Sequence, residues 1–592
     1  MALTAPSLSP AIVVKEIDIT GVAPNVDTST TGLVGKFRWG PVNQITAISN
    51  EGELAEMFGT PDTTHAVDYH SAAYFLKYSG NALVVRAASA DSCFNAVTRG
   101  TAPHIANKTA FEQNTYSSNG YWIARYPGTL GNSLAVKIFH LTSGESAGHV
   151  NAVADWAAWD YANKFDQITG TSYWATNIAP GTNTNDEMHV AVVDSDGLIS
   201  GTKGTVLETF AGLSVAVGAR TTDNGDNYLP NVINEASQYI YFADWDSSGG
   251  ASPVAGSKWG TAPAVGTTTE FSTDATWGEA TSSFVLGSGT DGPALTTGQI
   301  ATAFDEFEDQ ETVDVSILVV PGMGTTSDQT TVTNDVESIC AARKDCIAVS
   351  SPARDDVVNV AASSVVTNTL ATTDTFTSSS YLAVDNNYLK VYDKFNDAYI
   401  YIPAASSVAG LMAATDANFG PWYSPAGEAR GALRGVTALA HNPTKGNRDS
   451  LYKNGVNPIV QFSGMGPMLY GDKTKLSRPS AFDRINVRRL FLAIEKSIAQ
   501  AARLFMFEFN DEFTRSEFVG IIEPLLREIQ ARRGIQDFYV QCDETNNTAA
   551  VIDRNELIAS IYVKPARSIN FITLNFVAVR SGVDFEEVVG RV

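Results

Sequence analysis

The sequence predicts a multidomain protein of mixed α/β and α+β class, in which two α/β stretches flank a long loop-rich region that contains short strands. Three observations lead to this prediction. At 592 residues the chain is too long for a single hydrophobic core. Strand-like and helix-like segments alternate over about 32–87 and again over about 313–350. Between about 101 and 300 the chain is instead rich in Gly, Thr, Asn and Asp, which favours short strands and loops.

The overall composition is that of a globular protein. Hydrophobic residues make up 44% of the chain and charged residues 18%, which argues against disorder. The start of the chain lacks the pattern of a secretion signal, and no segment approaches the roughly 18 apolar residues of a membrane span. We therefore expect a protein that is made and kept in the cytoplasm. The scattered cysteines are expected to be buried thiols instead of a disulfide or zinc framework: Cys93, Cys340, Cys346 and Cys542.

The first predicted strand follows a stretch of ten residues, 1–10, that is rich in Pro and Ser. Residues 11–19 are mostly β-branched and are expected to be extended. A terminal strand of this kind either joins its own domain's sheet or, as an arm, adds to a sheet edge of a neighbouring molecule, and both arrangements stay open. The apolar positions of this strand are Ile12, Val13, Val14, Ile17 and Ile19.

The next segments alternate between strand and helix. A strand is expected over Gly32–Phe37, followed by a helix over Asn50–Phe58 in which Asn50 and Glu53 form a capping box. A second helix is expected near Val67–Tyr78, and it leads to the apolar strand Ala82–Arg86.

Residues Ala124–Ile138 join a polar turn to an alternating strand, and none of them has catalytic potential. Pro127-Gly128 and Gly131-Asn132 are turn signals, and the apolar residues from Leu134 to Ile138 fall on one face of a strand. The run therefore indicates a structural segment and not a catalytic site. Strands and helices alternate again later in the chain. We expect a strand over Val313–Val320, a helix over 332–344 and a strand over 347–350.

The last third of the chain has the strongest helical patterns. Ser480 and Asp483 resemble a capping box for a long helix whose apolar residues extend to Phe505. Thr514 and Glu517 are expected to open another helix, which Pro524 would kink or delay. That helix is expected to end at Gly534 with Arg532 and Arg533 in its last turn, before strands over 537–542, 556–563 and 569–579.

The net charge is unevenly distributed along the chain. The total is −24, from 64 acidic and 40 basic residues, which argues against general nucleic-acid binding. Between Pro425 and Ile535, however, 17 Lys and Arg stand against 11 Asp and Glu, a local charge of +6. This region is suited to an acidic partner, or it is simply a solvated basic surface.

Residues Gly287–Gly292 fit the G-x-G-x-x-G pattern of dinucleotide-binding loops and follow an apolar run. Pro293 and the residues after it interrupt the helix start that would hold a pyrophosphate. Gly471–Thr474 contains the Lys-Thr pair of a phosphate loop but lacks its glycine spacing. We therefore expect no nucleotide site and no cofactor.

Metal and acid–base chemistry are also disfavoured. His65 and His70 have neither the spacing nor the glutamate of a helical zinc protease. The acidic stretch Asp305–Glu311 is interpreted as solvated. No enzyme class emerges, so the protein is expected not to be an enzyme.

Several runs of the chain, in a specific order and spacing, together resemble the sheath proteins of contractile bacteriophage tails, especially the large sheaths of T-even-like phages. They are Gly35–Asn43, Glu53-Leu54 to Phe58-Gly59, Ala124–Ile138, Ser288–Gly292, Trp422–Gly427 with Arg430-Gly431, Asn457-Pro458, Gly471–Thr474, Val487–Phe491 and Phe507-Glu508. Departures from the family pattern concentrate between about 150 and 280.

The resemblance implies an α/β core formed by the N- and C-terminal parts, inserted outer domains and extended terminal arms. It further implies hexameric rings stacked helically around an inner tube, with a baseplate at one end and neck or terminator proteins at the other, in a virion tail assembled in host cytoplasm. Contraction would then drive the tube through the host envelope, with no nucleic-acid partner and no direct insertion into a membrane. The expected parts are residues 1–20 (strand arm), 21–100 (α/β), 101–300 (inserted, β-containing), 301–360 (α/β return), 361–580 (C-terminal core) and 581–592 (linking arm).

Under the same resemblance, particular residues acquire expected roles. The N-terminal strand and the C-terminal segment would link neighbouring subunits, the latter through Val583, Phe585, Val588 and Val589. The basic segment would face the tube, through residues on or beside the long helix: Arg488, Arg489, Lys496 and Arg503.

Two other classes stay open at the level of sequence. A loop-rich surface-layer protein or adhesin would share the composition but should carry an export signal. A dinucleotide enzyme would need a functional Gly287–Gly292 loop.

Overall fold

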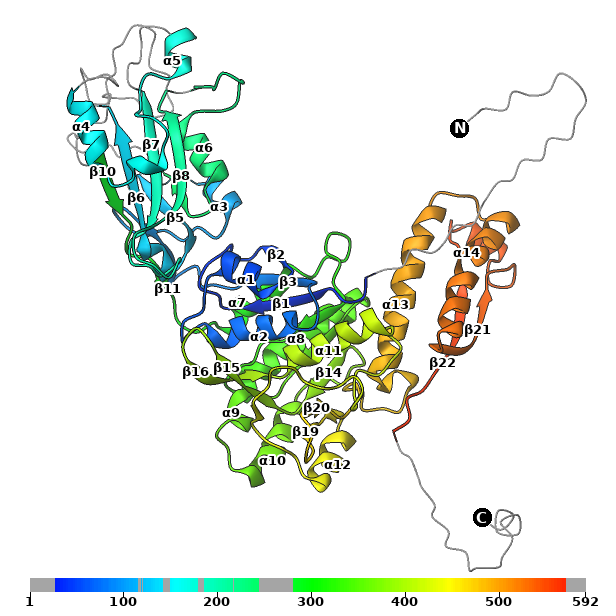
Figure 1. Cartoon of the computed structure of the whole chain (residues 1–592). Helices are drawn as coiled ribbons and strands as arrows, with labels where there is room; N and C mark the ends of the chain where they lie inside the picture. The colour runs from blue at the N-terminus through cyan, green and yellow to red at the C-terminus, as the bar shows by residue number, and fades with distance from the viewer. Residues whose placement is uncertain are drawn as a thin grey trace, which may run out of the picture. The chain divides into compact units, whose positions relative to one another are not determined.

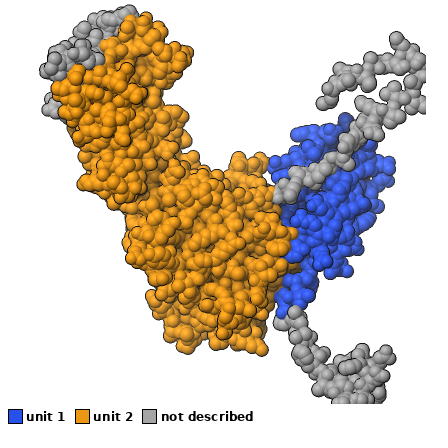
Figure 2. All heavy atoms as spheres, in the orientation of Figure 1, with its two compact units in different colours: residues 1–26, 420–424, 489–592 blue, residues 27–419, 425–488 orange. Residues whose placement is uncertain are grey.

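The computed structural model describes residues 27–570, apart from 115, 117, 118, 120, 142–149, 179–185, 217 and 244–280. The chain forms two compact units (Figure 2). One consists of residues 27–419 and 425–488, and the other contains 420–424 and 489–570 within the described part of the chain. No helix among the described residues has the length and apolarity needed to cross a bilayer.

The first unit is built on a seven-stranded sheet (Figure 1) with the strand order β18-β14-β13-β12-β1-β3-β2. All neighbouring strands pair in parallel except β2 and β3, as in doubly wound α/β folds. The bounds of the strands are β1 Thr31–Gly35, β2 Ile45–Ile48, β3 Ala82–Arg86, β12 Ile317–Val319, β13 Ile347–Ser350, β14 Leu382–Asp385 and β18 Val456–Asn457.

Helices cover both faces of this sheet. α7 and α8 pack on one face through a large buried cluster that includes Phe304, Phe307 and Val336. α2 and α11 pack together on the other face, where Asp68 of α2 lies against Gly35. The helices of this unit near the sheet are α1 Glu51–Phe58, α2 Ala66–Leu76, α7 Thr297–Asp305, α8 Thr326–Arg343, α9 Arg354–Val357, α10 Ala362–Thr373, α11 Ala405–Asn418 and α12 Lys445–Lys453.

Two smaller sheets accompany the seven-stranded sheet. One is three-stranded, with the order β16-β15-β17, and the other is the pair β19-β20. Their strands are β15 Tyr388–Asp393, β16 Ala398–Pro403, β17 Ala438–Leu439, β19 Ile459–Gln461 and β20 Pro467–Leu469.

Residues between β3 and α7 form two antiparallel four-stranded sheets, with the orders β10-β6-β7-β8 and β11-β4-β5-β9. Trp122, Leu134 and Val190 belong to the buried cluster that joins the two sheets. The strands are β4 Cys93–Val97, β5 Trp122–Pro127, β6 Leu134–His140, β7 Glu187–Asp194, β8 Thr205–Ser214, β9 Ile240–Phe242, β10 Thr281–Val285 and β11 Thr290–Asp291. The helices here are α3 Lys108–Glu112, α4 Val150–Ala158, α5 Tyr173–Asn177 and α6 Leu229–Ala236. We call residues 93–291 the inserted sheets.

In the second unit, two helices pack against an antiparallel pair of strands. Its core contains Trp422, Leu490 and Ile522, and the pair β21-β22 is antiparallel. The elements are α14 Glu512–Ala531, α15 Ala549–Ile552, β21 Ile535–Gln541 and β22 Ser560–Pro565, together with most of α13 Ile485–Ala502.

Many expected elements are confirmed. β3 and β13 have the predicted bounds, and Leu134, Val136 and Ile138 of β6 are fully buried. The Asn50 side chain caps α1 by accepting from Glu53 N at 2.9 Å, although the Glu53 carboxylate accepts from Ser49 N instead of completing the box at Asn50. All four cysteines are buried thiols, and the acidic side chains of 305–311 are exposed.

Other expected bounds are wrong. β12 is only three residues long, although Ser316 before it still makes backbone hydrogen bonds to Thr30 and to Ile347. Ser480 caps a 3₁₀ turn over Ala481–Asp483, so the long helix begins only at Ile485. α14 begins at Glu512, because the Asp511 carboxylate accepts from Thr514 N at 2.8 Å and so caps the helix earlier.

The end of α14 also differs from expectation. The helix continues through Pro524 and ends at Ala531, so Arg532 and Arg533 lie beyond its last turn. Arg533 has a φ of 67°, so the left-handed residue that stops the helix is an arginine and not Gly534. The expected strand over 11–19 lies outside the described residues, and so does the expected strand over 569–579 apart from its first two residues.

Candidate functional site

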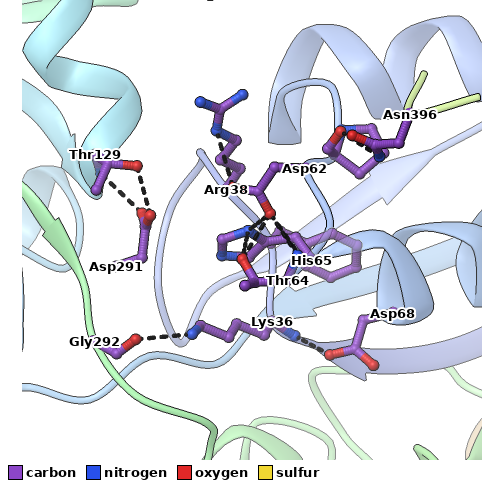
Figure 3. Close-up of polar contacts among 12 residues, drawn as sticks. Lys36, Arg38, Asp62, Thr64, His65, Asp68, Thr129, Asp291, Gly292 and Asn396 are labelled. Atoms are coloured by element: carbon purple, nitrogen blue, oxygen red, sulfur yellow. Dashed lines mark hydrogen bonds and ion pairs between the residues drawn. The ribbon is translucent and has the colours of Figure 1, made fainter.

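Three of the sequence runs that carry the family resemblance meet where the central sheet joins the inserted sheets. They are the loop after β1, the turn between β5 and β6, and the segment that includes β11 (Figure 3). The turn is a 3₁₀ helix over Thr129–Ser133 that follows Gly128, whose φ of 139° favours glycine. We call the residues that connect these runs the junction.

Arg86, the last residue of β3, is the central group of the junction. Its buried guanidinium donates to four backbone carbonyls: Phe37 O at 2.8 Å, Gly40 O at 2.8 Å, Arg38 O at 3.4 Å and Pro127 O at 2.6 Å. Burial lowers the pKa of the Arg86 guanidinium below its ordinary value. The sequence revealed this residue only as the end of an apolar strand.

Asp291 fixes the inserted turn from the other side. Its carboxylate accepts from Thr129 N at 2.8 Å and from Thr129 Oγ1 at 2.5 Å. Asn132 and Gly289 exchange two hydrogen bonds, of 2.7 and 3.0 Å. The glycine run 287–292 thus packs against protein, and both Asp291 and Gly289 within it are held by residues of the inserted turn.

Lys36 connects the same segment to the central sheet. Its backbone N–H donates to Asp68 Oδ2 at 2.7 Å, and its ammonium donates to Gly292 O at 3.0 Å and Pro293 O at 2.8 Å. Burial raises the pKa of Asp68 to about 6, although the hydrogen bond from Lys36 N opposes this shift. The junction is therefore a network of hydrogen bonds between fixed groups, which suits a structural role.

The two histidines next to the junction have carboxylate partners. His65 Nδ1 lies 2.7 Å from Asp62 Oδ1, and His70 Nε2 lies 3.0 Å from Asp393 Oδ1. Burial lowers the pKa of His65, and the hydrogen bond to Asp62 only partly offsets this. The structure does not bring the two histidines together on a shared ligand site, and the described residues contain no group of three or more His, Cys, Asp and Glu suited to a metal ion.

The place where doubly wound sheets usually bind ligands is filled here. That place lies at the carboxyl ends of β1 and β12, where the strand order reverses. The cavity there has a volume of about 10 Å³, and the Tyr388 hydroxyl and Pro403 lie against Gly322. Side chains of the protein thus pack against one another at this point of the fold.

The Lys-Thr pair of 471–474 is likewise used within the protein. The Lys473 ammonium donates to Tyr452 O at 2.7 Å, and its backbone N–H donates to Asn457 Oδ1 at 2.7 Å. Asp472 accepts from Arg484 at 3.0 Å and from the Tyr452 hydroxyl at 3.0 Å. These contacts fix β18 and the start of α13 instead of forming a phosphate cradle.

The four basic residues expected to face a tube differ in exposure. Arg488 is buried, donates to Ser380 Oγ at 2.8 Å and lies 4.3 Å from the ring centre of Tyr381. Arg489 is also buried, whereas Lys496 is half-buried and Arg503 is exposed. A tube contact is therefore more accessible to Lys496 and Arg503 than to the two arginines.

The residues expected to link subunits lie outside the described part of the chain. This applies to the N-terminal strand and to the C-terminal segment alike. Their roles stay predictions: Ile12, Val13, Val14, Ile17, Ile19, Val583, Phe585, Val588 and Val589.

Asp385, at the end of β14, makes the stability of the first unit depend on pH. Its carboxylate accepts from Asn387 N at 2.9 Å and Ser351 Oγ at 2.8 Å, yet burial raises its pKa to about 7. The folded chain thus holds a proton that the unfolded chain loses above its ordinary pKa of 3.8, so this contribution to stability is present below pH 3.8 and is lost as the pH rises toward 7.

We expect the D385N variant, which cannot ionise, to be progressively more stable relative to wild type as the pH rises from 4 to 7, with a constant difference above about pH 7. Differential scanning calorimetry of both proteins across this range measures the difference. A difference in melting temperature that stays flat from pH 4 to 8 would show that the Asp385 carboxyl ionises as in water. D355N is a matched control, because Asp355 is exposed.

Comparisons with known proteins identify relatives along nearly the whole chain. Three family models match: phage tail sheath protein central domain at 294–475, phage tail sheath C-terminal domain at 477–578, and tail sheath protein Gp18 domain III N-terminal region at 28–87. The tail sheath protein of Enterobacteria phage T4 is 32% identical over 98% of this chain and 99% of its own length. The tail sheath protein of Vibrio phage KVP40 is 32% identical over 98% of this chain and 100% of its own.

The fold has a relative among solved structures. A crystal structure of a sheath tail protein from Listeria innocua covers 93% of this chain and 98% of its own, with 12% identity and a TM-score of 0.52. This similarity concerns the fold alone.

Proposed function

The chain belongs to the phage tail sheath family, and we propose that it polymerises as stacked hexameric rings around an inner tail tube and contracts to drive that tube through the host envelope. The observation that carries this conclusion is the extent of the similarity to tail sheath proteins, which covers 98% of the chain instead of one domain. The chain is thus a structural component of a virion.

Contraction in this proposal uses no nucleotide and no catalytic step. The glycine run 287–292 is occupied by Asp291 and its partners, and the switch point of the central sheet is filled. The work would come from the difference in free energy between two packings of the same subunits, an extended lattice held kinetically and a contracted one. A role as an exported adhesin or a dinucleotide enzyme has no support among the relatives.

Subunits in this proposal stay linked through their terminal arms while the lattice changes. The arms are residues 1–20 and 581–592. β21 and β22 form a sheet of only two strands among the described residues, so their outer edges suit an added strand from a neighbour. Each hydrogen bond of such a strand contributes a net stabilisation of about 1 kcal/mol and can persist while the bodies rotate.

The basic segment 425–535 would face the inner tube, with Lys496 and Arg503 as the contact residues. Their exposure favours them over Arg488 and Arg489, which act within the fold. The acidic remainder of the chain would keep a lattice of many copies soluble. The two ends of the sheath would meet a baseplate and the neck or terminator proteins, after assembly in host cytoplasm.

Electron microscopy of the purified chain, alone and with its inner tube protein, tests this proposal. We expect hollow tubes of stacked rings, and sheaths around the inner tube when that protein is present. The K496E/R503E variant should still form hollow tubes, because these charges serve the tube and not the lattice. Its binding to inner tubes should fall about tenfold or more, since two attractive contacts become repulsive.

The matched control is R354E, which changes an arginine outside the basic segment whose side chain is 44% exposed. Wild-type protein that stays monomeric both alone and with inner tubes would contradict the proposed function. Equal loss of hollow tubes and tube-bound sheaths in K496E/R503E would assign the two residues to the lattice instead.

A further inference from the structure

The segment from the end of α13 into the first turn of α14 exposes an unusual concentration of large apolar side chains. Within residues 504–513 these are Leu504 (71% exposed), Met506 (61%), Phe507 (100%), Phe509 (82%) and Phe513 (71%). We call these five residues the phenylalanine loop. All of them belong to the second unit, whose helices α13 and α14 flank the segment in Figure 1.

The exposure is not the result of a loose backbone. Asn510, in the middle of the segment, donates to Glu556 O at 2.7 Å and to Asn547 Oδ1 at 3.3 Å. Its own side-chain oxygen accepts from Arg515 at 2.8 Å. Asp511 then caps α14. The loop is fixed at its base, so its rings are presented in a defined arrangement.

Phe507 has a strained backbone in addition to a fully exposed ring. Its φ of 72° lies in the left-handed region, which side chains other than Gly, Asn and Asp rarely adopt. Such strain in a bulky residue is typical of positions held for recognition.

The neighbouring Phe505 provides an internal comparison. Its ring packs edge-on against Phe518 at 5.3 Å and joins the core of the second unit. The segment therefore directs the ring of Phe505 into the core and the rings of Phe507 and Phe509 into solvent. The exposed rings contribute little to the stability of the isolated subunit.

The size of the exposed surface is that of an interface. At the exposures of Phe507, Phe509 and Phe513, the three rings alone present roughly 500 Å² of apolar surface. This already matches the largest apolar patch of an ordinary monomer, about 300–600 Å², before Leu504 and Met506 are added. It is more than half of the roughly 800 Å² that each partner buries in a stable protein complex.

The charges around the loop favour an apolar partner over an acidic one. Residues 504–513 contain no Lys or Arg and three acidic residues, Glu508, Asp511 and Glu512. This negative charge gives an acidic tube surface no electrostatic reason to bind the loop itself, whereas Arg503, which we assign to the tube, lies before it.

We infer that the phenylalanine loop is a docking surface for a second copy of this chain. The contact is heterologous, because the loop of one subunit inserts into a different surface of the next, as an open helical assembly requires. This inference rests on the proposed function and adds to it the residues that hold the lattice together apart from the terminal arms. The rings supply the apolar contact, and the anchored backbone limits the entropy lost on docking.

The F507S/F509S variant tests this inference. Its melting temperature should stay within about 2 °C of wild type, because both side chains are exposed. Polymer mass, measured by sedimentation and electron microscopy, should fall about tenfold or more at the concentration where wild type is half assembled. Y392S/Y399S is the matched control, because it removes two exposed aromatic side chains elsewhere and should assemble as wild type does.

A second measurement keeps the inference independent of polymer formation. A benzophenone amino acid in place of Phe507 should give, on irradiation of concentrated protein, a covalent dimer of the chain that disappears on hundredfold dilution. Such a dimer would support the inference even if no tubes form, in which case only the proposed function fails. Unchanged assembly of F507S/F509S, or adducts only within one chain or only to the tube protein, would overturn the inference.

Discussion

Replacing Arg86 by methionine is expected to lower the melting temperature of the first unit by roughly 5–10 °C. Methionine fills a similar volume but donates no hydrogen bonds, so the buried carbonyls of Phe37, Gly40 and Pro127 lose their donor. Each buried carbonyl without a donor costs about 1–3 kcal/mol, and the losses fall on one cooperative unit. Differential scanning calorimetry measures the shift.

The same substitution should also loosen the inserted sheets before the whole unit unfolds. Pro127 lies at the end of β5, whereas Phe37 and Gly40 follow β1, so the guanidinium holds two parts of the unit together. Limited proteolysis of R86M should cut between β3 and β5 at temperatures where wild type stays intact. R86K should fall between wild type and R86M, because one ammonium cannot reach all of these carbonyls at once.

R354M is the matched control for R86M, because the Arg354 side chain is 44% exposed and lies 3.7 Å from Asp355. An exposed pair of this kind contributes about 0–1 kcal/mol, so its loss should leave the melting temperature nearly unchanged. If R86M and R354M melted and digested alike, the carbonyl contacts of Arg86 would have no part in holding the junction.

Elements whose cause is local in sequence could be predicted well. β3 and β13 consist of short apolar runs between polar residues, and Asn50 lies directly before the helix that it caps. Errors appeared where two local signals compete. Ser480 and Asp511 are both good capping residues, but only the contacts of the folded chain decide which turn each one caps.

The junction could not be predicted, because its contacts connect residues far apart in the chain. Lys36 and Gly292 are 256 residues apart, and Arg86 and Pro127 are 41 apart. The three runs that meet there could be recognised in the sequence, but only as separate turn signals. The sequence could not show that one buried arginine, Arg86, connects two of them.

The sequence also could not predict which side chains point into the core and which point into solvent. Arg488 and Arg489 belong to a basic segment and were expected to face a partner, yet both are buried, and Arg488 lies against the rings of Tyr381 and Phe482. Conversely, Phe507 belongs to an apolar run but is fully exposed. The charge and hydropathy of a side chain indicate whether water or the core suits it better. Only the packing of the folded chain decides whether that side chain is in fact buried or exposed.

The hydrogen bonds of the junction limit which parts of the subunit could move during contraction. Fixed hydrogen bonds hold the inserted sheets to the central sheet, so the first unit is suited to move as one body. The changes between extended and contracted lattices would then fall on contacts between copies. In our proposal, those contacts are the surfaces that slide and the terminal arms that stay attached.

Truncation after Arg580 is expected to abolish continuous sheaths while leaving the subunit folded. The removed residues 581–592 combine the apolar Val583, Phe585, Val588 and Val589 with the acidic Asp584, Glu586 and Glu587. A twelve-residue tail with five apolar side chains, Val592 included, adds little to the fold of its own subunit. The melting temperature of the monomer should therefore change by less than about 2 °C.

The effect on assembly should be large, because in our proposal this tail adds a strand to the β21-β22 pair of a neighbouring subunit. Without it, rings lose their connection as soon as the lattice begins to contract. Electron microscopy of sheaths grown on inner tubes should show short or broken stacks that separate on contraction. A D584N/E586Q/E587Q variant of the full chain is the control, since it removes the charges but keeps the backbone and the apolar side chains, and it should assemble normally. Contraction-competent sheaths from the truncated protein would prove the linking role of this segment wrong, whereas loss of monomer stability would place the segment in its own subunit's fold.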